Sequence, residues 1–316
     1  MSTTGPRRIL LRVTSLQRYI AEEIATDHVD GLLTRREAMR RLALLGMGAA
    51  AAGDLIAACT KQQDATGSPK PTAGESPTGS AQLPGAANTL PTAPVTWAGP
   101  QGQLQGAWAQ AADSKGCVLV VHENKGLNDW VRSVAGRLAG AGHSALAIDL
   151  LSEEGGTGAF SDPAQATAAL GRIPPDRFTR DLNSGVAELK LRAPGQKVGV
   201  VGFCFGGGLV WLLLASGAPG VSAAVPFYGP LPANPDFAGS KAAVLAIYAA
   251  QDSRVTGSQA AAKAALDRAG LVNEIVVEPN ADHAFFNDTG PRYNAGASAD
   301  AWQRLLDWFG RYLAGQ

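Results

Sequence analysis

The chain has 316 residues, of which 46% are hydrophobic, and its 27 lysine and arginine residues balance 27 aspartate and glutamate residues. This length is sufficient for one large domain or two small ones, and the lack of a basic excess argues against nucleic acid as the main partner. Three scattered cysteines, Cys59, Cys117 and Cys204, exclude a disulfide framework, and without a C-x-x-C pair they give no zinc motif.

Residues 1–59 have the parts of an export leader. A cationic block at residues 34–41 precedes an apolar, Gly- and Ala-rich run at residues 42–52, which is the order found in secretory signals. The pair Arg35-Arg36 resembles a twin-arginine signal, although Ala38 stands where that motif usually carries a large apolar residue. Further upstream, a weak amphipathic helical stripe is formed by Leu16, Tyr19, Ile20, Glu23 and Ile24.

The apolar run ends at Cys59 in a sequence, Leu55-Ile56-Ala57-Ala58-Cys59, that resembles a bacterial lipobox. We therefore expect Cys59 to be lipidated and to become the mature N-terminus. A buried helix, a single membrane span, simple export and an uncleaved anchor are the alternatives, and Asp54 with its neighbouring glycines disfavours the span.

Residues 60–94 are rich in Pro, Gly, Ser, Thr and Ala, so they are predicted to form a disordered tether because they cannot bury a core. An export signal, a lipidated cysteine and a tether place the protein at the outer face of the cytoplasmic membrane, or in the periplasm or outside the cell.

Residues 95–316 alternate short apolar strands with amphipathic helices. A β-hairpin is expected around the turn at residues 99–102. Strands are then expected at residues 116–122, 144–150, 221–227, 242–248 and 274–277, and in the apolar run that begins at Lys197. Helices are expected at residues 128–138, 163–170, 176–191, 209–215, 258–269 and 299–313. This alternation predicts one doubly wound α/β domain with a mostly parallel sheet and helices on both faces, and we expect a monomer.

The central strand of this domain leads into Gly202-Phe203-Cys204-Phe205-Gly206, a nucleophile-elbow pattern with Cys in place of Ser. Such a turn is so tight that small residues must stand two positions either side of the nucleophile. Cys204 would lie at the N-terminus of a helix, where backbone N–H groups favour a thiolate. The backbone N–H of Phe205 would point toward an oxyanion. Cys117 lies in the middle of a strand and is expected to be an inert core residue.

A nucleophile on this fold needs an acid and then a histidine later in the chain. Asp252 follows one apolar strand and His283 follows the next, so both are predicted at the carboxyl edge of the sheet, where ligands bind in open α/β sheets. Among the other histidines, His28 and His143 are expected to be solvated and His122 to be a hydrogen-bonded structural residue.

These motifs, together with His122-Glu123-Asn124-Lys125-Gly126-Leu127, resemble the dienelactone hydrolase family of α/β-hydrolases over residues 97–314. The resemblance implies that Glu123 interacts with Cys204 and helps to generate the thiolate. It also implies that the backbone N–H groups of Asn124 and Phe205 form the oxyanion hole. The implied reaction hydrolyses a small-molecule ester or lactone through a thioacyl-enzyme, with no metal and no cofactor.

The substrate acid group of that family is bound by arginines, one of them shortly after the catalytic histidine. Here Phe286 and Asn287 stand in that neighbourhood, the next arginine is Arg292, and the segment 151–178 offers Arg172 and Arg177 only as distant candidates. The sequence therefore does not predict which ester or lactone is the substrate. Two other functions are also left open, namely a non-catalytic lipoprotein binding module on a hydrolase fold and a thioesterase or peptidase on the same fold.

Overall fold

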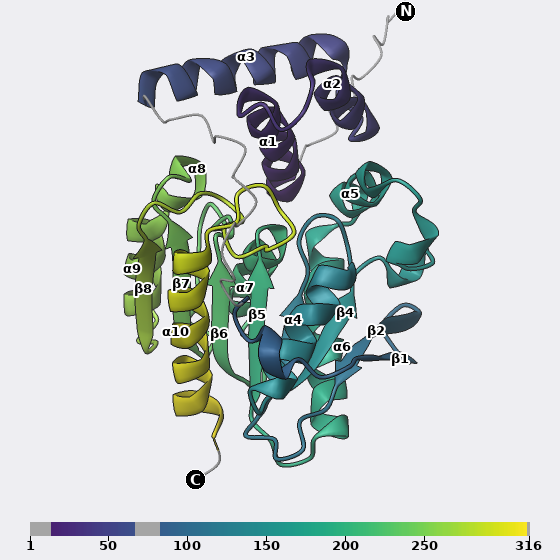
Figure 1. The fold of residues 1–316 in the computed structure, drawn as a ribbon, viewed down its shortest axis with the longest axis vertical. Coiled ribbons are helices and arrows are strands. Elements are labelled where there is room, and N and C mark those ends of the chain that lie inside the picture. The colour runs from purple at the N-terminus through teal and green to yellow at the C-terminus, as the bar shows by residue number, and fades with distance from the viewer. Residues whose placement is uncertain (1–13, 67–82, 315–316) are drawn as a thin grey trace, which may run out of the picture.

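The computed structural model describes residues 14–66 and 83–314, and within them eight strands form a single sheet in the order β1-β2-β4-β3-β5-β6-β7-β8 (Figure 1). The strands are β1 (Ala93–Ala98), β2 (Gln103–Ala109), β3 (Cys117–Val121), β4 (Ser144–Asp149), β5 (Val198–Phe203), β6 (Val221–Phe227), β7 (Ala243–Ala249) and β8 (Asn273–Glu278). The hairpin β1–β2 pairs antiparallel with itself and with β4, and all other pairs are parallel. The predicted doubly wound α/β class is confirmed.

The longer helices of the α/β domain lie against both faces of this sheet. They are α4 (Asp129–Gly140), α6 (Pro175–Arg192), α7 (Phe205–Ala215), α9 (Gln259–Arg268) and α10 (Ala295–Leu313), whereas α5 (Pro163–Arg172) packs against the N-terminal helices described below. In Figure 1, α4 and α10 lie in front of the sheet, while α6 and α7 contact each other and strand β5. Short helical turns complete the domain as η1 (Ala86–Asn88), η2 (Ser152–Glu154), η3 (Thr157–Ala159) and α8 (Ser253–Thr256).

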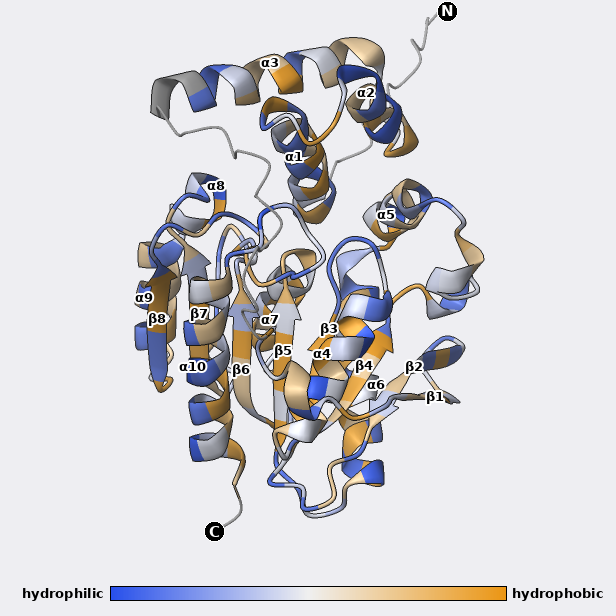
Figure 2. Cartoon of the chain, viewed as in Figure 1, coloured by the Kyte–Doolittle hydropathy of each residue, from blue (hydrophilic) through white to orange (hydrophobic). Residues whose placement is uncertain are grey.

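The core lies between the sheet and these helices. Strands β3, β4 and β5 are buried along their whole length, as expected for central parallel strands that are covered on both faces. Figure 2 shows the apolar residues concentrated in these central strands, with polar residues toward the outer surfaces of the helices. This arrangement fixes the carboxyl ends of β3, β5, β7 and β8 on one rigid edge.

Three helices from the N-terminal segment pack across that same carboxyl edge (Figure 1). They are α1 (Ser15–Val29), α2 (Arg35–Leu44) and α3 (Ala49–Thr66). Helix α1 begins at a capping box, in which Thr14 and Gln17 satisfy each other's backbone N–H groups. No helix among residues 14–66 and 83–314 has both the length and the apolar character needed to cross a bilayer.

The structure differs from the predicted boundaries around the tether. Residues 60–66 continue helix α3, and residues 83–94 pack against α4 before entering β1. Gly136 and Gly140 make this packing possible, since a Cβ at either position would collide with the backbone oxygen of Leu90 or Asn88. The middle of the predicted tether, residues 67–82, lies outside the described residues.

The prediction of a solvated His143 is wrong. Its side chain is buried against Phe309 of α10, with the ring centroids 5.9 Å apart. Burial lowers the pKa of His143 to about 4, so the imidazole is neutral at physiological pH.

Candidate active site

The predicted elbow forms between β5 and α7. Cys204 has φ 56° and ψ −118°, a left-handed backbone that is unusual for a residue with a side chain. The turn is held by the backbone N–H of Cys204, which donates to the carbonyl oxygen of Phe227 over 3.1 Å. A Cβ at Gly202 would lie 2.3 Å from the carbonyl oxygen of Gly206, so glycine is required for the turn to close.

The side chains predicted as acid and base, Asp252 and His283, meet at the ends of β7 and β8. Asp252 follows β7, and its Oδ2 lies 2.6 Å from Nδ1 of His283 in the loop after β8. The two loops are joined by the backbone N–H of Gln251, which donates to the carbonyl oxygen of Ala281. Both side chains are buried. This carboxylate orients the imidazole with Nδ1 as the donor, which leaves Nε2 of a neutral His283 free to accept a proton.

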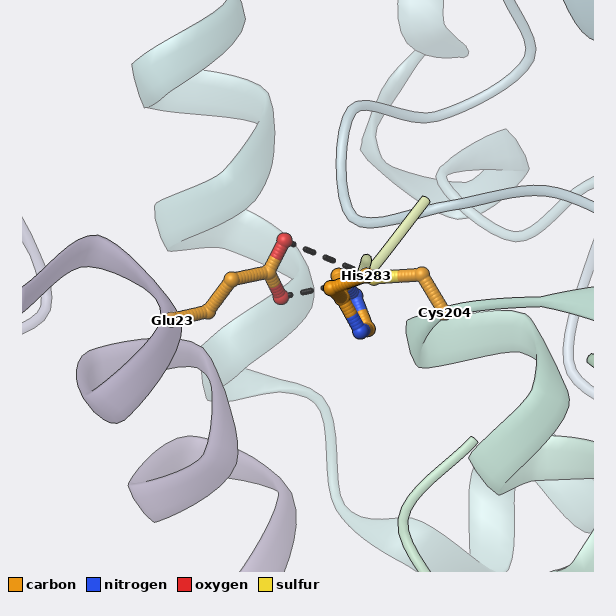
Figure 3. Close-up of side chains that lie close together, drawn as sticks. All are labelled: Glu23, Cys204 and His283. Carbon is orange, nitrogen blue, oxygen red and sulfur yellow. Dashed lines mark hydrogen bonds between the residues drawn. The ribbon is translucent and has the colours of Figure 1, made fainter. Parts of the chain in front are cut away.

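Two side chains of α1 contact the nucleophile and the base. The hydroxyl of Tyr19 lies 3.4 Å from the sulfur of Cys204 and 3.2 Å from Nε2 of His283, so it bridges the two. The Cys204 thiol donates to the carboxylate of Glu23, whose oxygens lie 3.3 Å and 3.4 Å from the sulfur. Figure 3 shows Glu23 reaching from its helix toward Cys204 and His283.

Two arginines hold α1 over the site. The guanidinium of Arg254, two residues after Asp252, lies 4.7 Å from the ring centroid of Tyr19 and donates to its carbonyl oxygen. Arg292 forms ion pairs with Asp27 over 2.9 Å and with Asp30 at the end of α1. Cationic side chains of the catalytic domain are thereby paired with groups of the N-terminal segment.

The electrostatic environment keeps the nucleophile in its thiol form. Burial raises the pKa of Cys204 well above its usual value, and the nearby carboxylates of Glu23 and Glu123 raise it further, against hydrogen bonds from Tyr19 and Phe205 that lower it. Burial lowers the pKa of His283, but the charge and hydrogen bond of Asp252 outweigh burial and raise it overall. The pair Asp252–His283 is therefore prepared to accept a proton, whereas Cys204 is held protonated.

The residues expected at the oxyanion side follow β3. Glu123 is buried, and its Oε2 accepts a hydrogen bond of 2.8 Å from Nδ2 of Asn287. Burial raises the pKa of Glu123, although Lys125 and Asn287 lower it. The carboxylate that accepts the thiol hydrogen is that of Glu23, so the activating role of Glu123 stays a prediction.

His122 has the structural role expected of it and fixes the backbone on the oxyanion side. Its Nδ1 lies 2.6 Å from the carbonyl oxygen of Glu123, and its Nε2 accepts from the backbone N–H of Leu150. Burial lowers the pKa of His122, which favours the neutral ring that these two bonds require. Asn124 comes next in the chain and is also buried, and its backbone role in an oxyanion hole stays a prediction.

The two arginine candidates of the segment 151–178 already have protein partners. Arg177 is paired with Glu153, Glu154 and Asp181, and Arg172 donates to the carbonyl oxygen of Leu44 in α2.

Among the cavities that border α1, two are lined by His283. One of about 400 Å³ lies between α1, α3 and the loops that carry Asp252 and Asp282. The other, of about 250 Å³, lies between α1, α5 and the loop from Glu123 to Lys125. Glu23 and His283 line both cavities. Helix α1 therefore divides a larger space above the catalytic residues.

Among the described residues, one group could hold a metal ion: Glu23, Cys204 and His283, with one ligand atom from each lying within 4.8 Å of the others. Thiolate, imidazole and carboxylate are donors that Zn²⁺ accepts. Here the thiol donates to the carboxylate, and Tyr19 bridges the sulfur and the imidazole. We interpret the group as the nucleophile and base closed by α1.

Sequence reasoning missed the contribution of Tyr19 and Glu23 to the site. Both belong to the amphipathic stripe of residues 16–24, which was the only local signal for a packed helix in the leader. Arg254 was also missed, because a position two residues after Asp252 in the sequence does not by itself indicate a role in the site. The positions of Cys204, Asp252 and His283 could be predicted because each lies at or shortly after the end of a strand.

The comparisons with known proteins cover the α/β domain. The model of the dienelactone hydrolase family matches residues 104–313. A curated Escherichia coli relative named "Putative carboxymethylenebutenolidase" is 34% identical over 62% of this chain and 76% of its own length.

Two solved structures superpose with a TM-score of 0.61. One is a "Putative Dienelactone Hydrolase" from Klebsiella pneumoniae, 30% identical over 70% of this chain and 99% of its own. The other is a dienelactone hydrolase-like promiscuous phosphotriesterase from metagenomic libraries, 25% identical over 72% of this chain and 100% of its own. The chain thus belongs to the dienelactone hydrolase family.

Proposed function

We propose that this protein hydrolyses a carboxylic ester or lactone with Cys204 as nucleophile, His283 as general base and Asp252 as the orienting acid. The observation that carries the proposal is the 2.6 Å contact between Asp252 and His283 beside a cysteine on a nucleophile elbow. Family membership supports the reaction class, since the curated relative is named for the hydrolysis of a lactone.

The reaction proceeds in two acyl transfers. His283 removes the thiol proton, and the sulfur of Cys204 attacks the carbonyl carbon to give a tetrahedral intermediate. The backbone N–H groups of Phe205 and Asn124 stabilise its oxyanion. Collapse breaks the ester C–O bond, and protonated His283 returns its proton to the leaving alkoxide. His283 then activates a water that attacks the thioester, which releases the acid and restores the thiol.

The test is hydrolysis of short aryl esters and of lactones by the purified full-length chain, compared with Cys204→Ala. The matched control is Cys117→Ala, which removes the other buried sulfur in the catalytic domain, at the start of β3. We expect Cys204→Ala to lose hydrolysis and Cys117→Ala to keep it. Equal background rates in the wild type and Cys204→Ala would contradict the proposal.

We also propose that the chain is exported and lipidated at Cys59, because the twin-arginine-like pair and the lipobox-like run stand in the required order. Cleavage before Cys59 would remove α1 and α2 from the mature protein. Metabolic labelling with a fatty acid tests this, with Cys59→Ala as the comparison. Label that persists in Cys59→Ala would refute lipidation at that residue.

A further inference from the structure

The side chains of α1 occupy the positions that a substrate needs. A carbonyl carbon must approach the sulfur of Cys204 to within van der Waals contact before attack. The carboxylate of Glu23 already lies 3.3 Å from that sulfur, and the Tyr19 hydroxyl lies 3.4 Å from it on a second side. Cys204 is only 1% exposed and His283 only 4%. An ester cannot reach the nucleophile while α1 is in place.

The same contacts block the proton transfer that activates the nucleophile. With Nδ1–H donated to Asp252, a neutral His283 has only Nε2 to accept a proton, and the Tyr19 hydroxyl lies within hydrogen-bonding distance of that atom, at 3.2 Å. The thiol hydrogen of Cys204 points to the Glu23 carboxylate instead of to the imidazole. In this arrangement both the thiol of Cys204 and Nε2 of His283 have a partner in α1.

Both apolar and polar contacts hold α1 to the domain: six of its residues are buried in the hydrophobic core, and ion pairs and a cation–π contact lie beside the site. Arg292 is paired with Asp27 and Asp30, and Arg254 stacks on Tyr19. The Arg292 side chain is only 9% exposed, so the loss of its carboxylate partners on α1 leaves a poorly compensated buried charge, which favours release of α1 from the domain. The family model matches residues 104–313, which do not include α1 to α3.

From these contacts we infer that α1 is an internal inhibitor, a plug that must leave the catalytic site before an ester or lactone can reach Cys204. The inhibitory effect of α1 on hydrolysis rests on the proposed hydrolase function. Whether α1 shields the Cys204 thiol from reagents can be measured without that function. Removal of the segment by processing before Cys59, or its release from the domain, would join the two flanking cavities and free Nε2 of His283.

Alkylation of Cys204 by iodoacetamide, measured by peptide mass spectrometry on the full-length chain, tests the plug without requiring hydrolysis. The variant Asp27→Asn/Asp30→Asn removes the two ion pairs between α1 and Arg292, leaves the pair of Arg292 with Asp282, and changes neither Cys204 nor His283. We expect Cys204 to react at least about tenfold faster in this variant, because a loosened α1 exposes the thiol more often. Asp54→Asn, an exposed change on α3, should react at the wild-type rate.

Hydrolysis by the same variants separates the possible outcomes. Alkylation and hydrolysis that rise together support the plug. Faster alkylation with no hydrolysis in any variant supports the plug and refutes the proposed reaction. Unchanged alkylation in Asp27→Asn/Asp30→Asn overturns the plug. Faster alkylation with slower hydrolysis also overturns it, because α1 would then belong to the working active site.

A second route does not depend on the double variant. A protease site placed within residues 67–82 allows the segment that carries α1 to α3 to be cut from the folded chain and separated by size exclusion. We expect Cys204 in the remaining domain to alkylate at least as fast as in the double variant. A slow rate in the separated domain, or a segment that separates only on unfolding, would overturn the inference.

Discussion

The α/β domain and the N-terminal helices are stabilised in different ways. Strands β3, β4 and β5 are buried along their whole length, so the domain is held by a continuous apolar core. Helix α2 buries only Ala38 and Leu42, and α3 has few buried residues. The contact of α1 with the site combines buried Ile20 and Tyr19 with ion pairs.

This difference means that one region determines the stability of the fold and the other controls access to the active site. A large apolar core forms cooperatively and keeps the catalytic residues in place, whereas a small, partly polar contact can open without unfolding the rest. The predicted catalytic residues therefore belong to the α/β domain, and access to them depends on the docking of α1. Four changes, taken in order of expected effect, test whether the two regions are as independent as this implies.

The largest effect is expected at the base. Asp252→Asn keeps the size of the side chain but removes the charge that orients His283 and stabilises its protonated form. We expect kcat/KM for an aryl ester to fall by about 10³- to 10⁴-fold, with little change in thermal stability. Asp236→Asn, an exposed change after β6, serves as the control. A fall below tenfold would show that Asp252 is not the orienting acid.

The next largest effect is expected on the free energy of unfolding when a glycine of the elbow is replaced. In Gly206→Ala the new Cβ would lie 2.5 Å from the carbonyl oxygens of Val121 and His122, which belong to the backbone and cannot move aside. We expect a loss of about 3 kcal/mol in unfolding free energy, a factor of roughly 150 in the folding equilibrium. Chemical denaturation measures it.

The control for the elbow is Gly310→Ala on α10, where a new Cβ meets nothing within 4 Å. Alanine in a helix is favoured over glycine by about 0.5–1 kcal/mol, so this variant should be slightly more stable than the wild type. Equal stabilities of the two variants would contradict the requirement for glycine at position 206.

These two regions also differ in how well the sequence predicts them. Cys204, Asp252 and His283 each follow an apolar strand, and the carboxyl ends of parallel strands must lie on one edge, so local patterns predict their meeting. The contact between Tyr19 and Cys204 joins residues 185 positions apart and depends on the docking of a whole helix. No pattern within α1 specifies that partner. Residues 34–59 resemble an export signal in composition, and composition does not show whether such a segment packs.

His143 illustrates the same limit within the domain. It follows Gly142 in a turn between α4 and β4, a place where polar residues are usually solvated. Its burial comes from α10, which packs over that turn some 160 residues later in the chain and brings Phe309 onto the ring. Only the tertiary arrangement determines its exposure.

A smaller effect is expected from the charge of Glu23. Its carboxylate opposes a second negative charge on Cys204 and, after burial, contributes most to the raised pKa of that thiol. Glu23→Gln removes the charge, so the pKa of Cys204 falls and more thiolate is present at a given pH. We expect the midpoint of the alkylation rate against pH to move to lower pH, and the rate below the wild-type midpoint to rise severalfold.

The matched control for that experiment is Glu22→Gln, on the same turn of α1, for which the Cys204 midpoint should stay in place. A midpoint that moves equally in both variants would mean that general loosening of α1, rather than the charge of Glu23, sets the reactivity of the thiol.

The smallest effect is expected where the N-terminal helices touch the domain far from the nucleophile. Arg40 of α2 pairs with Asp162 over 2.7 Å at the start of α5, with its side chain 44% exposed. Solvent screens such a pair, so Arg40→Gln should change the alkylation rate of Cys204 by less than about twofold. If Arg40→Gln instead matched Asp27→Asn/Asp30→Asn, the three N-terminal helices would open as one rigid unit. In that case control would belong to the whole segment and not to α1 alone.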